Sequence, residues 1–190
     1  KPEMKVLVVM GDGDALAIGG NHFIHAARRN IGLTAIVVNN SAYGMTGGQH
    51  SPTTPRGIKT ATTPYGHIEQ QFPIAELAAT AGASFVARST VYHVRELEKY
   101  LAQAIERDGF SLVEAVTYCH TTLGRINRWG TAPDMMRQLK EQSVTLAQAD
   151  KLEEDEKQTK IVRGVFADRD IPEYTRLYDQ VIEKAQQEAA

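Results

Sequence analysis

Two mainly apolar runs on either side of a helical pattern constrain the fold of this chain most strongly. Residues Val6–Val9 and Leu33–Val38 are rich in β-branched side chains, which is typical of strands buried on both faces of a parallel sheet. Between them, residues 15–30 carry apolar side chains at a spacing that favours a helix. A strand, a helix and a strand in this order predict a βαβ unit with a right-handed crossover.

The same alternation continues along the chain. The segment 41–66 is rich in glycine and proline, so we expect an irregular connection, and it is longer than most connections in compact domains. The patterns beyond it predict helices at 74–81 and 94–106, strands at 84–87 and 110–118, one helix over 135–150, a solvated helix end or linker over 151–160, an edge strand at 161–166 and a terminal helix at 172–189. This order predicts an α/β fold with a mainly parallel sheet and helices on both faces.

The length of 190 residues allows one sizeable core. We expect an α/β domain over residues 1–129 and an extension over residues 130–190 that packs on this domain or on a partner subunit. The chain starts at Lys1 and enters its first strand within a few residues, without the elements that usually precede such a strand. We therefore expect the N-terminal part of the domain to be missing, with a processed start or a removed tag as the alternative.

Charge, hydropathy and cysteine content exclude several classes of function. The 21 basic and 23 acidic residues give a formal charge of −2, so nucleic acid is not an expected partner. No apolar run is long enough to span a bilayer and no signal peptide opens the sequence, so we expect a cytoplasmic chain without a membrane partner. The single cysteine, Cys119, excludes an internal disulfide and a metal centre with several thiolates from this chain alone.

Polar residues follow the two predicted strands of the βαβ unit, as Gly11–Asp14 and Asn39–Ala42. Ligands of open parallel sheets bind at the carboxyl ends of the strands, and glycines next to a helix N-terminus suit a phosphate. A carboxylate in one loop and an amide in the other add the oxygen ligands that Mg²⁺ prefers. The pair predicts a metal-bridged diphosphate site, although each loop alone is better explained as a turn. The dinucleotide-binding and phosphate-loop motifs are both absent.

Gly-Asp-Gly and Asn-Asn, separated by 25 residues, resemble the thiamine diphosphate motif. Together with residues 18–30, Asn39–Gln49 and Ser51–Pro55, this run resembles the β subunit of 2-oxoacid:ferredoxin oxidoreductases and is most similar to the 2-oxoglutarate branch. The narrowest part of the resemblance is Thr-Gly-Gly-Gln at 46–49 followed by Ser-Pro-Thr at 51–53. The resemblance implies a thiamine diphosphate-binding fold.

The resemblance also implies cofactors and their ligands. Asp12 and Asn40 would bind Mg²⁺ through their side chains, and Ala42 would bind it through its backbone carbonyl. Met45 and Gly47 would lie near the substrate. The implied positions for thiamine diphosphate are Gly11, Asp12, Gly13, Asp14, Asn40, Ala42, Tyr43, Gly44, Met45 and Thr46.

Cys119 has two interpretations. A lone cysteine at the end of a strand is ordinarily a small buried hydrophobic residue. The segment 119–125, however, is similar to the region in which the family places the fourth thiolate of a 4Fe-4S cluster. The other three cysteines lie earlier in that family's chain and are absent here. Their absence agrees with a missing N-terminal part, and loss of the cluster is the alternative.

The resemblance implies oxidative decarboxylation of a 2-oxoacid with coenzyme A to acyl-CoA and CO₂, with electrons passing through the cluster to ferredoxin. The 2-oxoacid that it favours is 2-oxoglutarate. A partner α subunit would supply the glutamate that activates the cofactor and most of the groups that bind substrate, so we assign no catalytic residue to this chain. An αβ pair doubled by two-fold symmetry, a heterotetramer, would follow. The alternatives are a non-redox thiamine diphosphate decarboxylase or synthase and a non-catalytic α/β interaction module.

Overall fold

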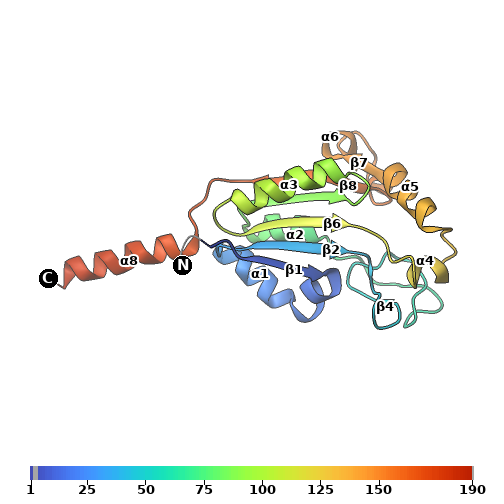
Figure 1. Ribbon diagram of the computed structural model, residues 1–190, viewed down its shortest axis with the longest axis horizontal. Coiled ribbons are helices and arrows are strands. Elements are labelled where there is room, and N and C mark those ends of the chain that lie inside the picture. The colour runs from blue at the N-terminus through green and yellow to red at the C-terminus, as the bar shows by residue number, and fades with distance from the viewer. Residues whose placement is uncertain (2–3, 190) are drawn as a thin grey trace.

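A computed structural model of the chain describes residues 1 and 4–189, and its centre is one twisted sheet (Figure 1). In spatial order the strands are β1 (Leu7–Gly11), β2 (Thr34–Asn39), β6 (Ser111–Val116), β5 (Phe85–Thr90), β8 (Ile161–Asp168) and β7 (Ser143–Thr145). The first four strands are parallel, β8 is antiparallel to β5, and β7 is parallel to β8. The predicted mainly parallel α/β sheet is confirmed.

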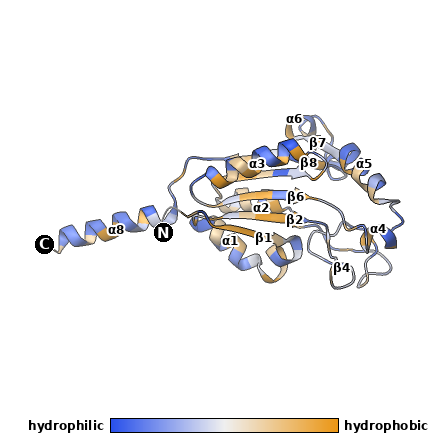
Figure 2. Cartoon of the chain, viewed as in Figure 1, coloured by the Kyte–Doolittle hydropathy of each residue, from blue (hydrophilic) through white to orange (hydrophobic). Residues whose placement is uncertain are grey.

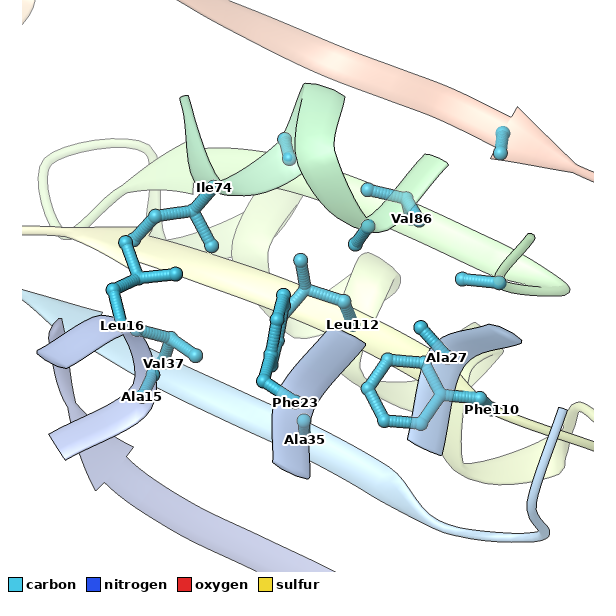
Figure 3. Close-up of a cluster of buried hydrophobic side chains, with 14 residues drawn as sticks. Ala15, Leu16, Phe23, Ala27, Ala35, Val37, Ile74, Val86, Phe110 and Leu112 are labelled. Carbon is cyan, nitrogen blue, oxygen red and sulfur yellow. The ribbon is translucent and has the colours of Figure 1, made fainter. Parts of the chain in front are cut away.

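Helices cover both faces of this sheet. Helices α1 (Gly20–Arg29) and α2 (Ile74–Ala81) contribute to the larger hydrophobic core, shown in Figure 3, and α3 (Val94–Glu106) packs on the opposite face. Side chains of β6 alternate between the two cores, since Leu112 belongs to the first and Val113 to the second. Because β1, β2, β6 and β5 are parallel, their carboxyl ends lie at the same end of the sheet.

The first strand differs from its prediction. We expected burial on both faces, but the side chains of Leu7, Val8 and Val9 are 44%, 37% and 66% exposed. The reason is the place of β1 at the end of the strand order, where no described residue pairs with its outer edge. An apolar run indicates a strand, but it does not indicate whether that strand is central or terminal.

The helix predicted over 15–30 is interrupted. A π-helical turn, η1 (Asp14–Ile18), precedes α1, and the backbone N–H of Gly19 donates to the carbonyl oxygen of Asp14 at 2.9 Å. A Cβ atom on Gly19 would lie 2.3 Å from that same oxygen, so only glycine fits here. This π-helical turn directly follows the first polar loop. Such turns occur frequently at functional sites.

The region after residue 129 also departs from the prediction of one helix over 135–150. Helix α5 (Ala132–Gln142) ends where β7 begins, and the short helix α6 (Leu146–Ala149) follows. Pairing of β7 with β8 overrides the helical pattern, and the Thr145 side chain then caps α6. Strand β8 was predicted to be an edge strand, and this prediction is wrong, because β7 pairs with the first residues of β8. The segment 151–160 contains only the exposed turn α7 (Glu154–Lys157).

The chain ends in a helix, as predicted. Helix α8 (Tyr174–Glu188) projects from the body of the molecule and contributes no buried residue to it (Figure 1). Segment 41–66 is irregular apart from the pairing of β3 (Ala42–Tyr43) with β4 (Gln49–His50). Among the described helices, none combines the length and the apolar character needed to cross a membrane.

Candidate functional site

Asp12 is the most enclosed acidic side chain at the carboxyl end of the sheet. It is 1% exposed, and its Oδ2 atom accepts hydrogen bonds from the hydroxyls of Ser51 and Thr53 at 2.5 and 2.6 Å. Its Oδ1 atom accepts from the backbone N–H of Asn40 at 3.3 Å. None of the ion pairs found within residues 1 and 4–189 includes Asp12. Because a buried carboxylate without a cation is costly, this arrangement fits a bound metal ion.

The second polar loop meets Asp12 because β1 and β2 are neighbours in the sheet. Residues 39–42 form a turn in which Ser41 has a φ of 59° and the backbone N–H of Ala42 donates to Oδ1 of Asn40 at 3.0 Å. No group of three or more His, Cys, Asp or Glu side chains that could hold a metal exists in the part of the chain that the structure describes. A metal here would therefore rely on one carboxylate with amide and carbonyl oxygens, a donor set that suits Mg²⁺ beside a diphosphate.

The glycine loop after β1 is packed closely. A Cβ atom on Gly13 would lie 2.3 Å from Cε1 of Tyr43, so the tyrosine ring rests directly on the loop backbone. Burial raises the pKa of Tyr43, and the charges of Asp12 and Asp14 raise it further. Asp14 is exposed and accepts a hydrogen bond from the backbone N–H of Gly11 at 3.1 Å. The two acids of the loop thus differ, because Asp12 faces the buried site and Asp14 closes the turn.

The glycine-rich loop 43–49 contacts the segment that carries Cys119. A Cβ atom on Gly44 would lie 3.2 Å from Sγ of Cys119, and one on Gly48 would lie 2.8 Å from Cβ of Thr122. Gly48 has a φ of 87°, so both its space and its backbone favour glycine. Cys119 also packs in a small cluster with Ala42. The lone thiol is therefore adjacent to the loop that follows the candidate metal ligands.

Cys119 is buried, but its surroundings favour the thiolate. Burial raises the pKa of this thiol, whereas hydrogen bonds from the Thr122 hydroxyl and from the backbone N–H groups of Leu123 and Thr122 lower it, and the net pKa lies below the ordinary value. The Sγ atom is 2.8 Å from Oγ1 of Thr122. The thiolate is the form that binds metals. These hydrogen bonds therefore make the thiol easier to ionise than a cysteine that only packs in an apolar cluster.

Three of the positions predicted to bind cofactor or substrate lie away from Asp12. Met45, Thr46 and Gly47 form the exposed tip of the loop, and Met45 is fully exposed. The Thr46 hydroxyl donates to Gln49 at 2.8 Å, within the loop itself. This tip is available to another molecule, and within the described residues it binds no group of the candidate metal site.

The two hydroxyls that hold Asp12 were not predicted as site residues. In the sequence, Ser51 and Thr53 are only part of the motif that carries the family resemblance. They lie 39 and 41 residues after Asp12, in a segment with no regular pattern. What distinguishes them is their burial beside the polar ends of β1 and β2, and only the folded structure shows this burial.

The comparisons with known proteins agree with this geometry. Residues 1–115 match the family described as thiamine pyrophosphate enzyme, C-terminal TPP binding domain. A solved 2-oxoglutarate:ferredoxin oxidoreductase from Magnetococcus marinus, with 2-oxoglutarate, coenzyme A and succinyl-CoA bound, is similar with a TM-score of 0.81 and 25% identity. The similarity covers 98% of this chain and 64% of that chain.

Curated relatives narrow the class. The 2-oxoglutarate synthase subunit KorB of Methanothermobacter thermautotrophicus is 51% identical over 172 residues, which are 90% of this chain and 60% of the relative. The KorB subunit of Methanocaldococcus jannaschii is 46% identical over 188 residues, which are 99% of this chain and 70% of the relative. The chain thus spans 60% of the length of the first relative and 70% of the second.

The matched family model defines the class, a thiamine pyrophosphate-binding enzyme domain. Within that class, the chain belongs to the family of 2-oxoacid:ferredoxin oxidoreductase β subunits that includes the 2-oxoglutarate synthase subunits KorB. The family resemblance stated from the sequence is confirmed.

Proposed function

We propose that this chain is the cofactor-binding part of a β subunit of a 2-oxoglutarate:ferredoxin oxidoreductase. The observation that carries the proposal is the buried carboxylate of Asp12, held by two hydroxyls and an N–H group and paired with no cationic side chain in the described residues. In this proposal Asp12 and Asn40 hold Mg²⁺ through their side chains, and Ala42 holds it through its carbonyl oxygen. The backbone of Gly11 and Gly13 approaches the diphosphate.

Thiamine diphosphate, when bound, would supply the electron sink for decarboxylation of a 2-oxoacid. The residues of this chain bind and orient that cofactor. Tyr43 packs on the glycine loop after β1, Asp14 closes the turn of that loop, and Gly44 lies beside Asn40. The exposed Met45, Thr46 and Gly47 would face the approaching substrate and α subunit. The names of the relatives and the molecules bound in the Magnetococcus structure support 2-oxoglutarate and coenzyme A as the substrates.

Cys119 is proposed as the fourth ligand of a 4Fe-4S cluster that passes electrons to ferredoxin. Its lowered thiol pKa and its contact with Gly44 support this role. The remaining ligands would come from outside residues 1–190. Such a cluster, when bound by Cys119, would supply an electron acceptor close to the loop 43–49.

The organisation of the whole complex is also a proposal. We assign residues 1–129 to the cofactor domain and 130–190 to an extension with two roles. Strand β8 of the extension pairs with β5 of the domain, and the exposed helix α8 is left for an α subunit or a second β subunit of an α₂β₂ heterotetramer. We propose a cytoplasmic location for this complex.

The test compares Asp12→Ala with wild type in the full-length αβ complex, purified without oxygen. Thiamine diphosphate and Mg²⁺ content is measured together with the reduction of ferredoxin or a viologen dye that depends on 2-oxoglutarate and coenzyme A. We expect Asp12→Ala to lose both cofactors and the activity. The control Glu98→Ala removes an exposed acid of α3 that forms no ion pair among the described residues, and it keeps the cofactors and the activity.

Each contrary outcome selects another function. Bound cofactor without electron transfer in the full-length wild type indicates a non-redox thiamine enzyme. The absence of bound cofactor and of cofactor binding on titration indicates a non-catalytic module. For the cluster, Cys119→Ser is expected to lower iron and acid-labile sulfide while thiamine diphosphate stays bound, and unchanged iron content contradicts the proposed ligand.

A further inference from the structure

A buried ion pair lies beside the candidate metal site. Glu114 of β6 is 3% exposed, and its Oε2 atom accepts a hydrogen bond from Nε of Arg88 of β5 at 2.6 Å. The two residues are direct neighbours in the parallel register of β5 and β6. Arg88 also donates to Glu76 of α2 at 2.7 Å, so its guanidinium is held from two sides.

The second oxygen of Glu114 connects this pair to the site. Its Oε1 atom accepts from Nδ2 of Asn39 at 2.8 Å. The other end of the Asn39 amide, Oδ1, accepts from the backbone N–H of Ser41 at 3.1 Å and lies 3.0 Å from the hydroxyl of Thr53. Glu114 of β6 therefore holds the Nδ2 end of an amide whose Oδ1 end accepts from the turn 39–42 and lies beside a hydroxyl bound to Asp12.

Stability alone does not explain a charged pair at this place. Burying two ions costs several kcal/mol per ion before their attraction is counted, and well-packed apolar side chains often serve equally well. The two residues that precede Glu114 in β6, Leu112 and Val113, are apolar and belong to the two cores. The hydrogen bond from Asn39 to Glu114 offers a geometric explanation for a charged pair at this place.

We propose that Glu114, held by Arg88, is a positioning residue for the metal site. Through Asn39, whose Oδ1 atom accepts from the backbone N–H of Ser41, it fixes the turn that presents Asn40 and Ala42. This inference rests on the proposed function, because it concerns the same Mg²⁺ and thiamine diphosphate. Groups that orient metal ligands typically contribute about 10-fold to 100-fold to metal affinity.

The test titrates Mg²⁺ into the full-length αβ complex that has been stripped of cofactor, at a fixed concentration of thiamine diphosphate. Glu114→Gln keeps the size of the side chain and removes the charge that holds Arg88. We expect its apparent Mg²⁺ affinity to fall about 10-fold. Glu76→Gln removes the outer, half-exposed partner of Arg88 and is the matched control, with a change within about twofold.

A double-mutant cycle separates positioning from a general loss of stability. If Glu114 acts through Asn39, then Asn39→Ala with Glu114→Gln binds Mg²⁺ no more weakly than Asn39→Ala alone. A Glu114→Gln complex with wild-type Mg²⁺ affinity overturns the inference even if its melting temperature is lower. If Glu114→Gln does not fold, Arg88→Lys replaces it, since lysine cannot reach both carboxylates in the same way, and unchanged Mg²⁺ affinity in Arg88→Lys overturns the inference.

Failure of the proposed function gives a different result. In that case the wild-type complex shows no Mg²⁺-dependent binding of thiamine diphosphate at all. Wild-type binding that is insensitive to Glu114 leaves the proposed function standing and removes only the positioning role.

Discussion

Among single residues, Gly13 is constrained by the side chain that packs against its backbone. Its backbone has a φ of −65°, which any residue adopts, so the need for glycine comes only from the ring of Tyr43, 2.3 Å from the position of a Cβ atom. We expect Gly13→Ala to displace Tyr43 and to lower the free energy of unfolding by about 1–3 kcal/mol. Urea unfolding of the purified chain measures this loss.

The matched control is Gly20→Ala in the first turn of α1. A Cβ atom there meets nothing within 4 Å, so this change is expected to be neutral or to stabilise the chain by up to about 1 kcal/mol. Equal stability of Gly13→Ala and wild type contradicts the proposed close packing of Tyr43. Loss of stability in both variants indicates a general need for flexibility in this region instead.

Only some residues of the candidate site could be predicted from the sequence. Asp12 and Asn40 could be predicted to meet, because each follows a strand and consecutive strands of a βαβ unit are parallel. Ser51 and Thr53 could not, since they lie in an irregular loop without periodicity. Glu114 lies inside the predicted strand 110–118, and Arg88 lies one residue beyond the predicted strand 84–87. Their contact depends on the pairing of β6 with β5, which the order of elements along the chain does not reveal.

At the scale of elements, Glu173 joins α8 to the sheet. Its Oε1 atom accepts from the backbone N–H of Gly32 at 2.9 Å, and its Oε2 atom caps α8 by accepting from the N–H groups of Thr175 and Arg176. Burial works to raise the pKa of Glu173, but the hydrogen bonds to Thr175, Gly32 and Arg176 outweigh it and lower the pKa from 4.5. The ionised form is therefore favoured by folding.

We expect Glu173→Gln to lower the free energy of unfolding by about 1–2 kcal/mol at pH 7. Since the folded pKa is depressed, the carboxylate stabilises the chain above the unfolded pKa, and this contribution is lost as the pH falls through the folded value. Urea unfolding at pH 7 and again below pH 4.5 should show the gap to wild type narrowing in acid. Glu183→Gln, an exposed change on the same helix, is the control, and a gap that is constant with pH would refute the cap.

The elements themselves were largely predictable. Helices α2 and α3 have the predicted bounds, because both are bordered by Pro73, Gly82 or turns and carry clear apolar faces. The helix over 15–30 was wrong in its continuity because a contact within the turn requires Gly19. The helix over 135–150 was wrong because the pairing of β7 with a distant strand outweighs local propensity.

At the scale of the whole molecule, α8 is separate from the core. It buries no side chain, and its anchors lie at its beginning, in Glu173 and in the ion pair of Arg176 with Asp108 at 2.8 Å. We expect a chain that ends after Arg176 to keep its melting temperature within a few degrees of the full chain, because about 1 kcal/mol or less is lost with exposed residues. Differential scanning fluorimetry compares the two, and a large drop would show that α8 stabilises the body.

Strand β1, by contrast, belongs to the sheet and is mainly hydrophobic (Figure 2). Several of its apolar side chains are exposed. Leu7 and Val9 of β1, and Met4 and Val6 just before it, are between 44% and 66% exposed. The outer backbone groups of β1 pair with no described residue. An exposed apolar edge is a template for association. We therefore expect the chain of residues 1–190 on its own to self-associate as its concentration rises, as measured by sedimentation velocity.

A single charge on this edge tests the cause. Val9→Lys places a positive charge on the exposed strand and should shift the chain toward monomer with an unchanged circular dichroism spectrum. Val181→Lys adds the same charge to exposed α8, so it should not reduce an association that β1 drives. If Val181→Lys alone yields monomers, α8 is the associating element. If the unmodified chain stays monomeric at all concentrations, the exposed apolar edge does not drive self-association. Contact with a different chain is then the remaining explanation for its apolar side chains.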